Sequence, residues 1–184
     1  VVSDLGNLGI TEVKITDLNG KVLLSNRTKQ FAGYTNYAGN KKLTAAKGES
    51  FIISVSRIDT TYAMQRAIWI DFNLDGEFDA KEKVLQENST KNLTFTDTFN
   101  IDTASTLGLS RIRVGANTAG KTDYGCGPHI SGEFEDYGLI ISTDQTNPII
   151  ELIGKDTIGV EMCLPYAEPG FRAFDNIDGD ITSK

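Results

Sequence analysis

Residues 93–101 read LTFTDTFNI, and this alternation decides the fold class. Leu93, Phe95, Phe99 and Ile101 share one side of an extended chain, while threonines and an asparagine occupy the other. A period of two is typical of a strand with one buried and one solvated face. Further short runs rich in Ile, Val, Phe and Thr are ITEVKI (10–15), KVLLS (21–25), FIISV (51–55), AIWIDF (67–72), SRIRV (110–114) and DYGLIIS (136–142). The pattern predicts an all-β protein with an antiparallel β-sandwich of jelly-roll or immunoglobulin-like type.

The charge and hydrophobicity of the chain favour some classes of binding partner and argue against others. The chain has 184 residues, with 18 Lys and Arg against 25 Asp and Glu, and a net charge of -7. This balance argues against nucleic acid, whose phosphates such a surface repels, and favours cations. Apolar runs fall short of the roughly 20 residues of a membrane-spanning helix, so we expect no direct membrane insertion. The two cysteines and single histidine, His129, lack the spacing of a zinc site.

A polar, proline-containing stretch near residue 145 predicts three segments along the chain. A polar stretch, STDQTNP, follows DYGLIIS and ends in proline, which is typical of a linker. We therefore expect a β-sandwich over residues 1–143, a linker over 144–148 and the beginning of a second domain over 149–184. The alternative is that the last residues pack onto the first domain. The first residues lack an initiator methionine and a signal peptide, and we expect the sequence to be a piece of a longer chain with adjacent domains.

The stretch WIDFNLDGEFDAKE carries a calcium-type spacing. Counting from Asp71, it matches D-x-[DN]-x-[DN]-G-x5-E, with Gly76 at position six and Glu82 at position twelve. Alternate oxygen donors suit a cation that takes six to eight ligands, and glycine permits the sharp turn. The predicted metal ligands are Asp71, Asn73, Asp75, Glu77 through its carbonyl, Asp79 and Glu82. Because the flanks are strand-like, we expect a structural Ca²⁺; the alternative is an acidic turn without metal.

A second acidic cluster lies in GEFEDYG. In a strand, Glu133 and Glu135 would share one face and Asp136 would take the other. Three interpretations stay open: a contribution to the calcium region, structural acids at a sheet end, or the acid and base of a glycan hydrolase. Spacing alone does not decide between them.

Together these motifs resemble a known family. WIDFNLDGEFD and GEFEDYGLII, preceded by GYTNYAG and KGESFIISV, are similar to the GEVED domain of secreted proteins of the Bacteroidetes, over about Ile10 to Ser142. Phe134 replaces the usual valine of the naming motif. The resemblance implies a β-sandwich in a secreted or cell-surface bacterial protein, with no established catalytic activity. The family often carries an early cysteine, so it also implies that Cys126 bridges to a residue before Val1; a free thiol and a bridge to Cys163 are the alternatives.

The end of the chain resembles a different family. PIIELIGKDTIGVE and AFDNIDGDIT are similar to the opening part of a bacterial immunoglobulin-like surface repeat. The resemblance implies an incomplete second β-domain over residues 149–184.

These inferences together predict a non-catalytic, calcium-stabilised module of a secreted or cell-surface multidomain protein, serving adhesion, spacing or ligand presentation. Its expected partners are calcium and a cell-surface glycan or protein. One alternative is a carbohydrate-binding accessory module of a secreted hydrolase or peptidase, which exposed aromatic rings would mark. The other is a glycan hydrolase that uses Glu133 and Glu135.

Overall fold

The computed structural model describes residues 9–28, 33–88, 90–118, 125 and 132–183. Within these residues the protein is all-β, and no helix is long and apolar enough to cross a membrane. The chain divides into two compact units, Val1–Thr143 and Asp144–Lys184. The all-β prediction is confirmed.

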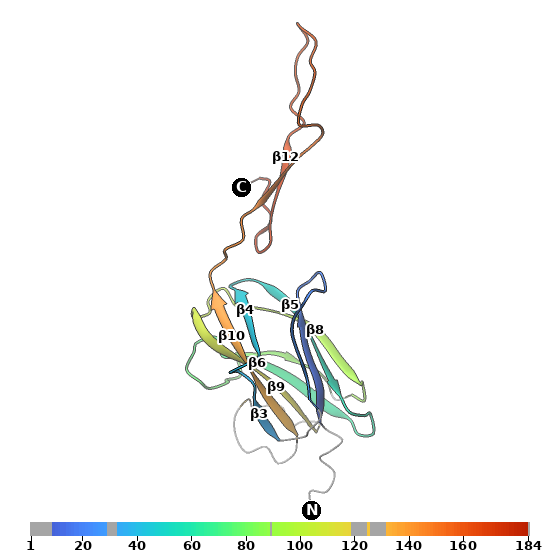
Figure 1. Ribbon diagram of the computed structural model, residues 1–184, viewed down its shortest axis with the longest axis vertical. Helices are drawn as coiled ribbons and strands as arrows, with labels where there is room; N and C mark the ends of the chain where they lie inside the picture. Colours follow the sequence, from blue (N-terminus) through green and yellow to red (C-terminus); the bar gives the residue numbers. More distant parts are fainter. Residues whose placement is uncertain (1–8, 29–32, 89, 119–124, 126–131, 184) are drawn as a thin grey trace, which may run out of the picture. The chain divides into compact units, whose positions relative to one another are not determined.

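The first sheet of unit 1 is antiparallel throughout. Its strand order is β2 (Val22–Arg27), β1 (Ile10–Thr16), β5 (Ser50–Arg57), β8 (Thr94–Asn100) (Figure 1). Alternation explains these strands: in β5 every second side chain, from Phe51 to Arg57, is buried. The intervening Ser54 and Ser56 hydroxyls bond Thr96 and Thr94 of β8 on the outer, solvated face. One apolar and one polar face is what a sandwich sheet needs.

The second sheet is mixed, which differs from the purely antiparallel prediction. It contains β3 (Tyr34–Asn36), β4 (Lys42–Ala46), β6 (Met64–Ile70), β7 (Lys83–Gln86), β9 (Gly108–Thr118) and β10 (Glu133–Ser142). The strands β10, β9, β6 and β7 pair antiparallel in this order. On the other edge of β10, both β3 and β4 run parallel to it. Local alternation does not encode direction, so the sequence could not distinguish these pairings.

The two sheets enclose the main core of the sandwich. Both sheets of unit 1 contribute inward apolar side chains that have almost no exposed surface, among them Val13, Ile53, Ile68, Ile112 and Leu139. Side chains on both faces are buried from Arg66 to Ile70 in β6 and from Glu133 to Leu139 in β10, so these parts of the central strands are covered on both faces. A covering layer must therefore lie on the outer side of the second sheet.

That outer side carries a second, smaller apolar cluster. Ala67 and Trp69 of β6 and Phe134 of β10 lie there together with Phe78, which belongs to the loop between β6 and β7. Gly115 of β9 lies between the strands of Trp69 and Phe134, and a Cβ there would come within 2.5 Å of the Phe134 ring and 3.1 Å of the indole. Glycine thus allows the two rings to approach each other, with centroids 6.4 Å apart.

Unit 2 is a small three-stranded sheet of β11 (Ile149–Leu152), β12 (Phe171–Asp175) and β13 (Gly179–Asp180). Its strands pair antiparallel. Most of its large apolar side chains are exposed, and Ala173 is the buried apolar residue among those described. A sheet with both faces wet gains little from hydrophobic burial, so unit 2 has much less core than unit 1.

We expect limited proteolysis to cut the segment 143–148. This segment has no regular structure and is largely exposed, whereas Ser142 ends a strand hydrogen-bonded on both edges. A protease-resistant product ending close to Ser142 should accumulate, as measured by mass spectrometry of timed digests. A resistant 143–148 segment, combined with unfolding on truncation after Ser142, would show that unit 2 belongs to the first sandwich.

Candidate metal centre

The predicted calcium loop connects two paired strands. It begins directly after Ile70, the last residue of β6, and ends before Lys83, the first residue of β7. The amide of Ile70 donates to the Glu82 carbonyl at 2.9 Å, and the amide of Asp71 donates to the Arg111 carbonyl of β9 at 3.1 Å. The sheet therefore holds the first and twelfth positions of the loop close together at its base.

The backbone of the loop turns as the spacing requires. Leu74 and Gly76 both adopt left-handed conformations, with φ of 63° and 85°. A left-handed glycine at position six costs little, whereas other residues there are strained. The short side chains of Asn73 and Asp75 each accept a hydrogen bond from the amide two residues later. These Asx turns support the tight chain reversal.

Two carboxylates at the base of the loop are buried. Glu82 Oε1 accepts from the amides of Phe72 at 2.9 Å and Asn73 at 3.4 Å, and its Oε2 accepts from the amide of Asp79 at 3.1 Å. Asp71 Oδ2 accepts from the amide of Gly76 at 3.2 Å. Burial raises the pKa of Glu82, the backbone bonds oppose this, and the nearby charge of Asp71 adds to the rise. Among the described residues, Asp71 Oδ1 is buried without a hydrogen-bond partner.

The remaining predicted ligands are exposed. Asp75 Oδ2 accepts from the Asn73 amide group at 2.8 Å, and Asp79 Oδ1 accepts from the amides of Lys81 and Glu82. Glu77 is exposed as well. Within the part of the chain that the structure describes, no three acidic, histidine or cysteine side chains converge into a group that could hold a metal ion. The fold therefore brings Asp71 and Glu82 together at the base and leaves the other side chains turned to the loop's own amides.

The donor set nevertheless fits Ca²⁺ chemically. Asp71 and Glu82 already point into the loop, and a buried carboxylate oxygen without a partner is costly unless a cation or proton compensates it. Asn73 and Asp75 bond exposed groups, so rotating them inward breaks only contacts that water replaces. Rotating Asp79 inward also breaks its hydrogen bond from the amide of the buried Glu82. The donors are all oxygen, the type that Ca²⁺ prefers.

Two arginines that sequence reasoning did not select hold the outside of the loop, together with Asp136 of the second acidic cluster. Arg113 of β9 lies 4.4 Å from the centroid of the Phe78 ring. Its guanidinium binds Asp136 of β10 in a fork, with Nε donating to Oδ1 at 2.7 Å and Nη2 to Oδ2 at 2.8 Å. Arg111 Nη2 donates to the carbonyl of Gly76 at 3.0 Å. Arg111 and Arg113 are two residues apart in SRIRV, so strand alternation places both on one face. A pair of cations on one face of a strand, in a chain with an acidic loop, was the signal that could have identified them.

The acids of GEFEDYG separate as their alternation predicts. Asp136 lies on the outer face of the second sheet, where Tyr34 Oη also donates to its Oδ2 at 2.9 Å. Glu133 and Glu135 face the interior between the sheets. Glu133 Oε2 accepts from the amide of Ile10 at 2.6 Å, and the Tyr137 hydroxyl donates to Glu135 Oε2 at 2.6 Å.

Burial raises the pKa of Glu135 to about 7; the Tyr137 hydrogen bond opposes the rise and the charge of Glu133 adds to it. Burial and the charge of Glu135 also raise the pKa of Tyr137. Neither Glu133 nor Glu135 has an exposed surface. Their position counts against the glycan hydrolase interpretation, because acid and base must reach a sugar. Glu133 pairs with Ala116 of β9, which pairs on its other side with Arg66 near the start of β6. Asp71 follows the other end of β6, so the position of Glu133 also counts against a role in the calcium loop.

Of the two cysteines and the histidine, the structure describes Cys163. Cys163 is exposed and free. Cys126 and His129 lie outside the described residues.

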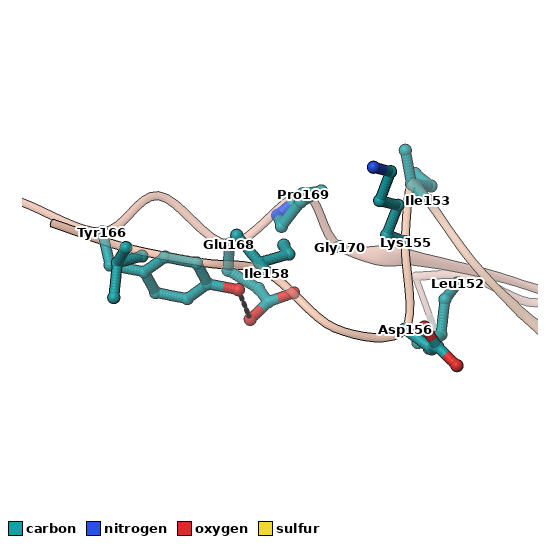
Figure 2. Close-up of a pocket in the computed structure, with 10 residues that line it drawn as sticks. Leu152, Ile153, Lys155, Asp156, Ile158, Tyr166, Glu168, Pro169 and Gly170 are labelled. Atoms are coloured by element: carbon teal, nitrogen blue, oxygen red, sulfur yellow. Dashed lines mark hydrogen bonds between the residues drawn. The ribbon is translucent and has the colours of Figure 1, made fainter.

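Unit 2 carries a shallow groove of its own. Figure 2 shows its lining, which includes Leu152, Ile153, Ile158, Tyr166 and Pro169. The Tyr166 hydroxyl donates to Glu168 Oε2 at 2.8 Å across this surface. The lining is exposed and mixes these apolar side chains with the charged Lys155, Asp156 and Glu168, and it lacks the enclosed form of a ligand pocket.

The fold defines a β-sandwich module, and a comparison with protein families gives a match. Residues 65–140 match the model of the GEVED domain. The predicted resemblance is thereby confirmed for these residues, which include the candidate loop and the GEFED motif. A β-rich module of this kind fits an accessory, non-catalytic role. The matched segment does not reach residues 149–184, so the immunoglobulin-like resemblance stays a prediction.

Solved structures also match. One is the soluble domain of PmoD from Methylocystis sp. ATCC 49242 (Rockwell), with a TM-score of 0.33 and 10% identity, covering 71% of this chain and 89% of that chain. A comparison with curated proteins gives no match.

Proposed function

We propose that this chain is a non-catalytic β-sandwich module stabilised by Ca²⁺ and carried by a secreted or cell-surface multidomain protein, where it serves spacing, adhesion or ligand presentation. One observation carries the calcium proposal: a loop with the spacing of a calcium site has its first and twelfth side chains buried at the base, with an unpartnered oxygen of Asp71 among the described residues.

In this proposal the chain's own residues act as follows. Asp71 and Glu82 supply buried carboxylates at the base of the loop. The exposed side chains of Asn73, Asp75 and Asp79 rotate inward to face the ion. The carbonyl of Glu77 supplies a main-chain oxygen. When bound, Ca²⁺ compensates the charge of the two buried carboxylates and cross-links the ends of β6 and β7.

A structural role follows from the position of the loop. Its Phe78 covers the outer side of the second sheet, so ordering the loop also completes the smaller apolar cluster. Strands flank the loop, and this arrangement offers no helix pair that calcium could open. We therefore propose a permanently held ion in a calcium-rich extracellular setting.

Calcium should bind the metal-free protein and raise its stability. At a free concentration of about 100 times the dissociation constant, a ligand that binds only the folded state adds roughly 2.7 kcal/mol. Isothermal titration after chelation measures binding, and thermal unfolding with calcium or chelator measures the gain. Magnesium should bind more weakly, because its smaller octahedral shell uses fewer of these oxygens.

Matched variants separate the ion from general charge effects. Asp75→Ala should remove most of the calcium-dependent gain, whereas Asp97→Ala, on the exposed edge strand β8, should retain it. Absence of calcium heat at millimolar concentration, with equal melting temperatures in calcium and chelator, would leave the acidic turn as the correct interpretation.

A further inference from the structure

We propose that Arg111, held by Asp136, is a positioning residue for the calcium loop, and that it sets the affinity of the site without contacting the ion. This inference rests on the proposed function. The observations that lead to it are contacts outside the loop, between the loop backbone and the strands β9 and β10.

Arg111 makes a bridge between the sheet and the loop. Its Nη2 donates to the carbonyl of Gly76, and its Nη1 lies 3.7 Å from Asp136 Oδ2. The same guanidinium lies 5.7 Å from the centroid of the Phe78 ring. Arg111 thus contacts the residues on both sides of Glu77.

Asp136 makes this bridge rigid. It has no exposed surface, and it accepts hydrogen bonds from the Arg113 fork and from Tyr34. Charge-assisted and bidentate contacts of this kind are short and geometrically specific. Arg113 also binds the carbonyl of Gly125 and lies against the Phe78 ring. Asp136 therefore orients two arginines, one for the Gly76 carbonyl and one for the Phe78 ring.

The segment from Gly76 to Phe78 is consequently held at both ends. Fixing the Gly76 carbonyl fixes the peptide plane that leads into Glu77, the residue whose carbonyl is a proposed ligand. Anchoring Phe78 limits the freedom of the chain on the other side. A loop that is ordered before binding loses less conformational entropy when the ion enters, so its affinity is higher. Removing Arg111 should then weaken calcium binding although every proposed ligand remains.

The decisive comparison is the calcium dissociation constant of Arg111→Gln and wild type. Loss of one charge-assisted hydrogen bond to the loop should weaken binding roughly tenfold. Arg111→Lys keeps the charge but lacks the planar fork, so it should fall between the two. Arg27→Gln is the matched control, because Arg27 is exposed and pairs with Glu12 on the first sheet. Its affinity should equal that of wild type.

A second readout distinguishes positioning from general stability. Terbium, a calcium-sized ion that oxygen ligands bind, should show luminescence sensitised by Trp69, the single tryptophan, which precedes Asp71 by two residues. Arg111→Gln should shift the terbium titration to higher concentration. The melting temperature in chelator reports the purely structural contribution of Arg111.

The outcomes separate this inference from the proposed function. If wild type binds calcium and both Arg111 variants bind it within twofold of wild type, the inference is wrong and the calcium site stands. A lower melting temperature in chelator with an unchanged dissociation constant would also overturn it. If wild type binds neither calcium nor terbium, both proposals fail.

Discussion

Replacing Arg66 by methionine should lower the free energy of unfolding by about 3–5 kcal/mol, because it leaves a buried carboxylate without its partner. Arg66 has no exposed surface and binds Glu87 in a fork, at 2.6 and 2.8 Å. Its guanidinium also donates to the carbonyls of Val55, Asn92 and Leu93. These contacts join β6 of the second sheet to β5 of the first at one end of the sandwich.

Urea unfolding of wild type and Arg66→Met measures this loss. The double variant Arg66→Met with Glu87→Met should recover part of it, since no buried charge then remains unpaired. Arg27→Met, which removes an exposed ion pair, should change stability by less than about 1 kcal/mol. A similarly small loss for Arg66→Met would show that the buried pair is not a major contributor to stability.

Glu135→Gln should stabilise the protein at alkaline pH, by about 3 kcal/mol at pH 8. Burial raises the pKa of Glu135 from 4.5 to about 7, and this difference corresponds to about 3 kcal/mol. Because the folded state binds the proton more tightly, the stabilisation by protonation is complete below about pH 4.5. It is lost as the pH rises through about 7. Glutamine keeps an acceptor for the Tyr137 hydroxyl and carries no charge.

The measurement is the difference in free energy of unfolding between Glu135→Gln and wild type, taken from pH 4.5 to 8 in chelator. The difference should grow across this range, while other carboxylates affect both proteins alike. Glu12→Gln, at the solvated face of β1, controls for removal of a charge at the surface. A difference that stays constant with pH would contradict burial as the dominant influence on Glu135.

Much of the sandwich could be predicted from sequence because strand alternation is a local property. The faces of LTFTDTFNI and of GEFEDYG follow from a period of two: Phe99 is buried, Thr94 and Thr96 are exposed, and Glu135 and Asp136 lie on opposite faces. The direction of pairing is not local. The strands β3 and β4, which pair parallel with β10, are separated from it by about a hundred residues of sequence.

In the candidate site, too, the sequence predicts what depends on neighbouring residues and not what depends on other strands. The spacing of Asp71, Gly76 and Glu82 identified the loop, because a turn with a glycine at a fixed offset and oxygen donors on alternate residues is encoded within twelve residues. The same spacing could not show that Asp71 and Glu82 alone are buried at its base. It also could not select Arg111 and Asp136, which reach the loop from other strands.

By itself, the sequence determined that this protein is built from strands, which side chains share a strand face, and where the acidic turn lies, because each depends on neighbours a few residues apart. The tertiary structure alone decided which strands pair in parallel, which face of GEFEDYG enters the core and which arginines hold the loop. Those outcomes depend on side chains meeting across sheets, where burial raises the free-energy cost of every unpartnered charge.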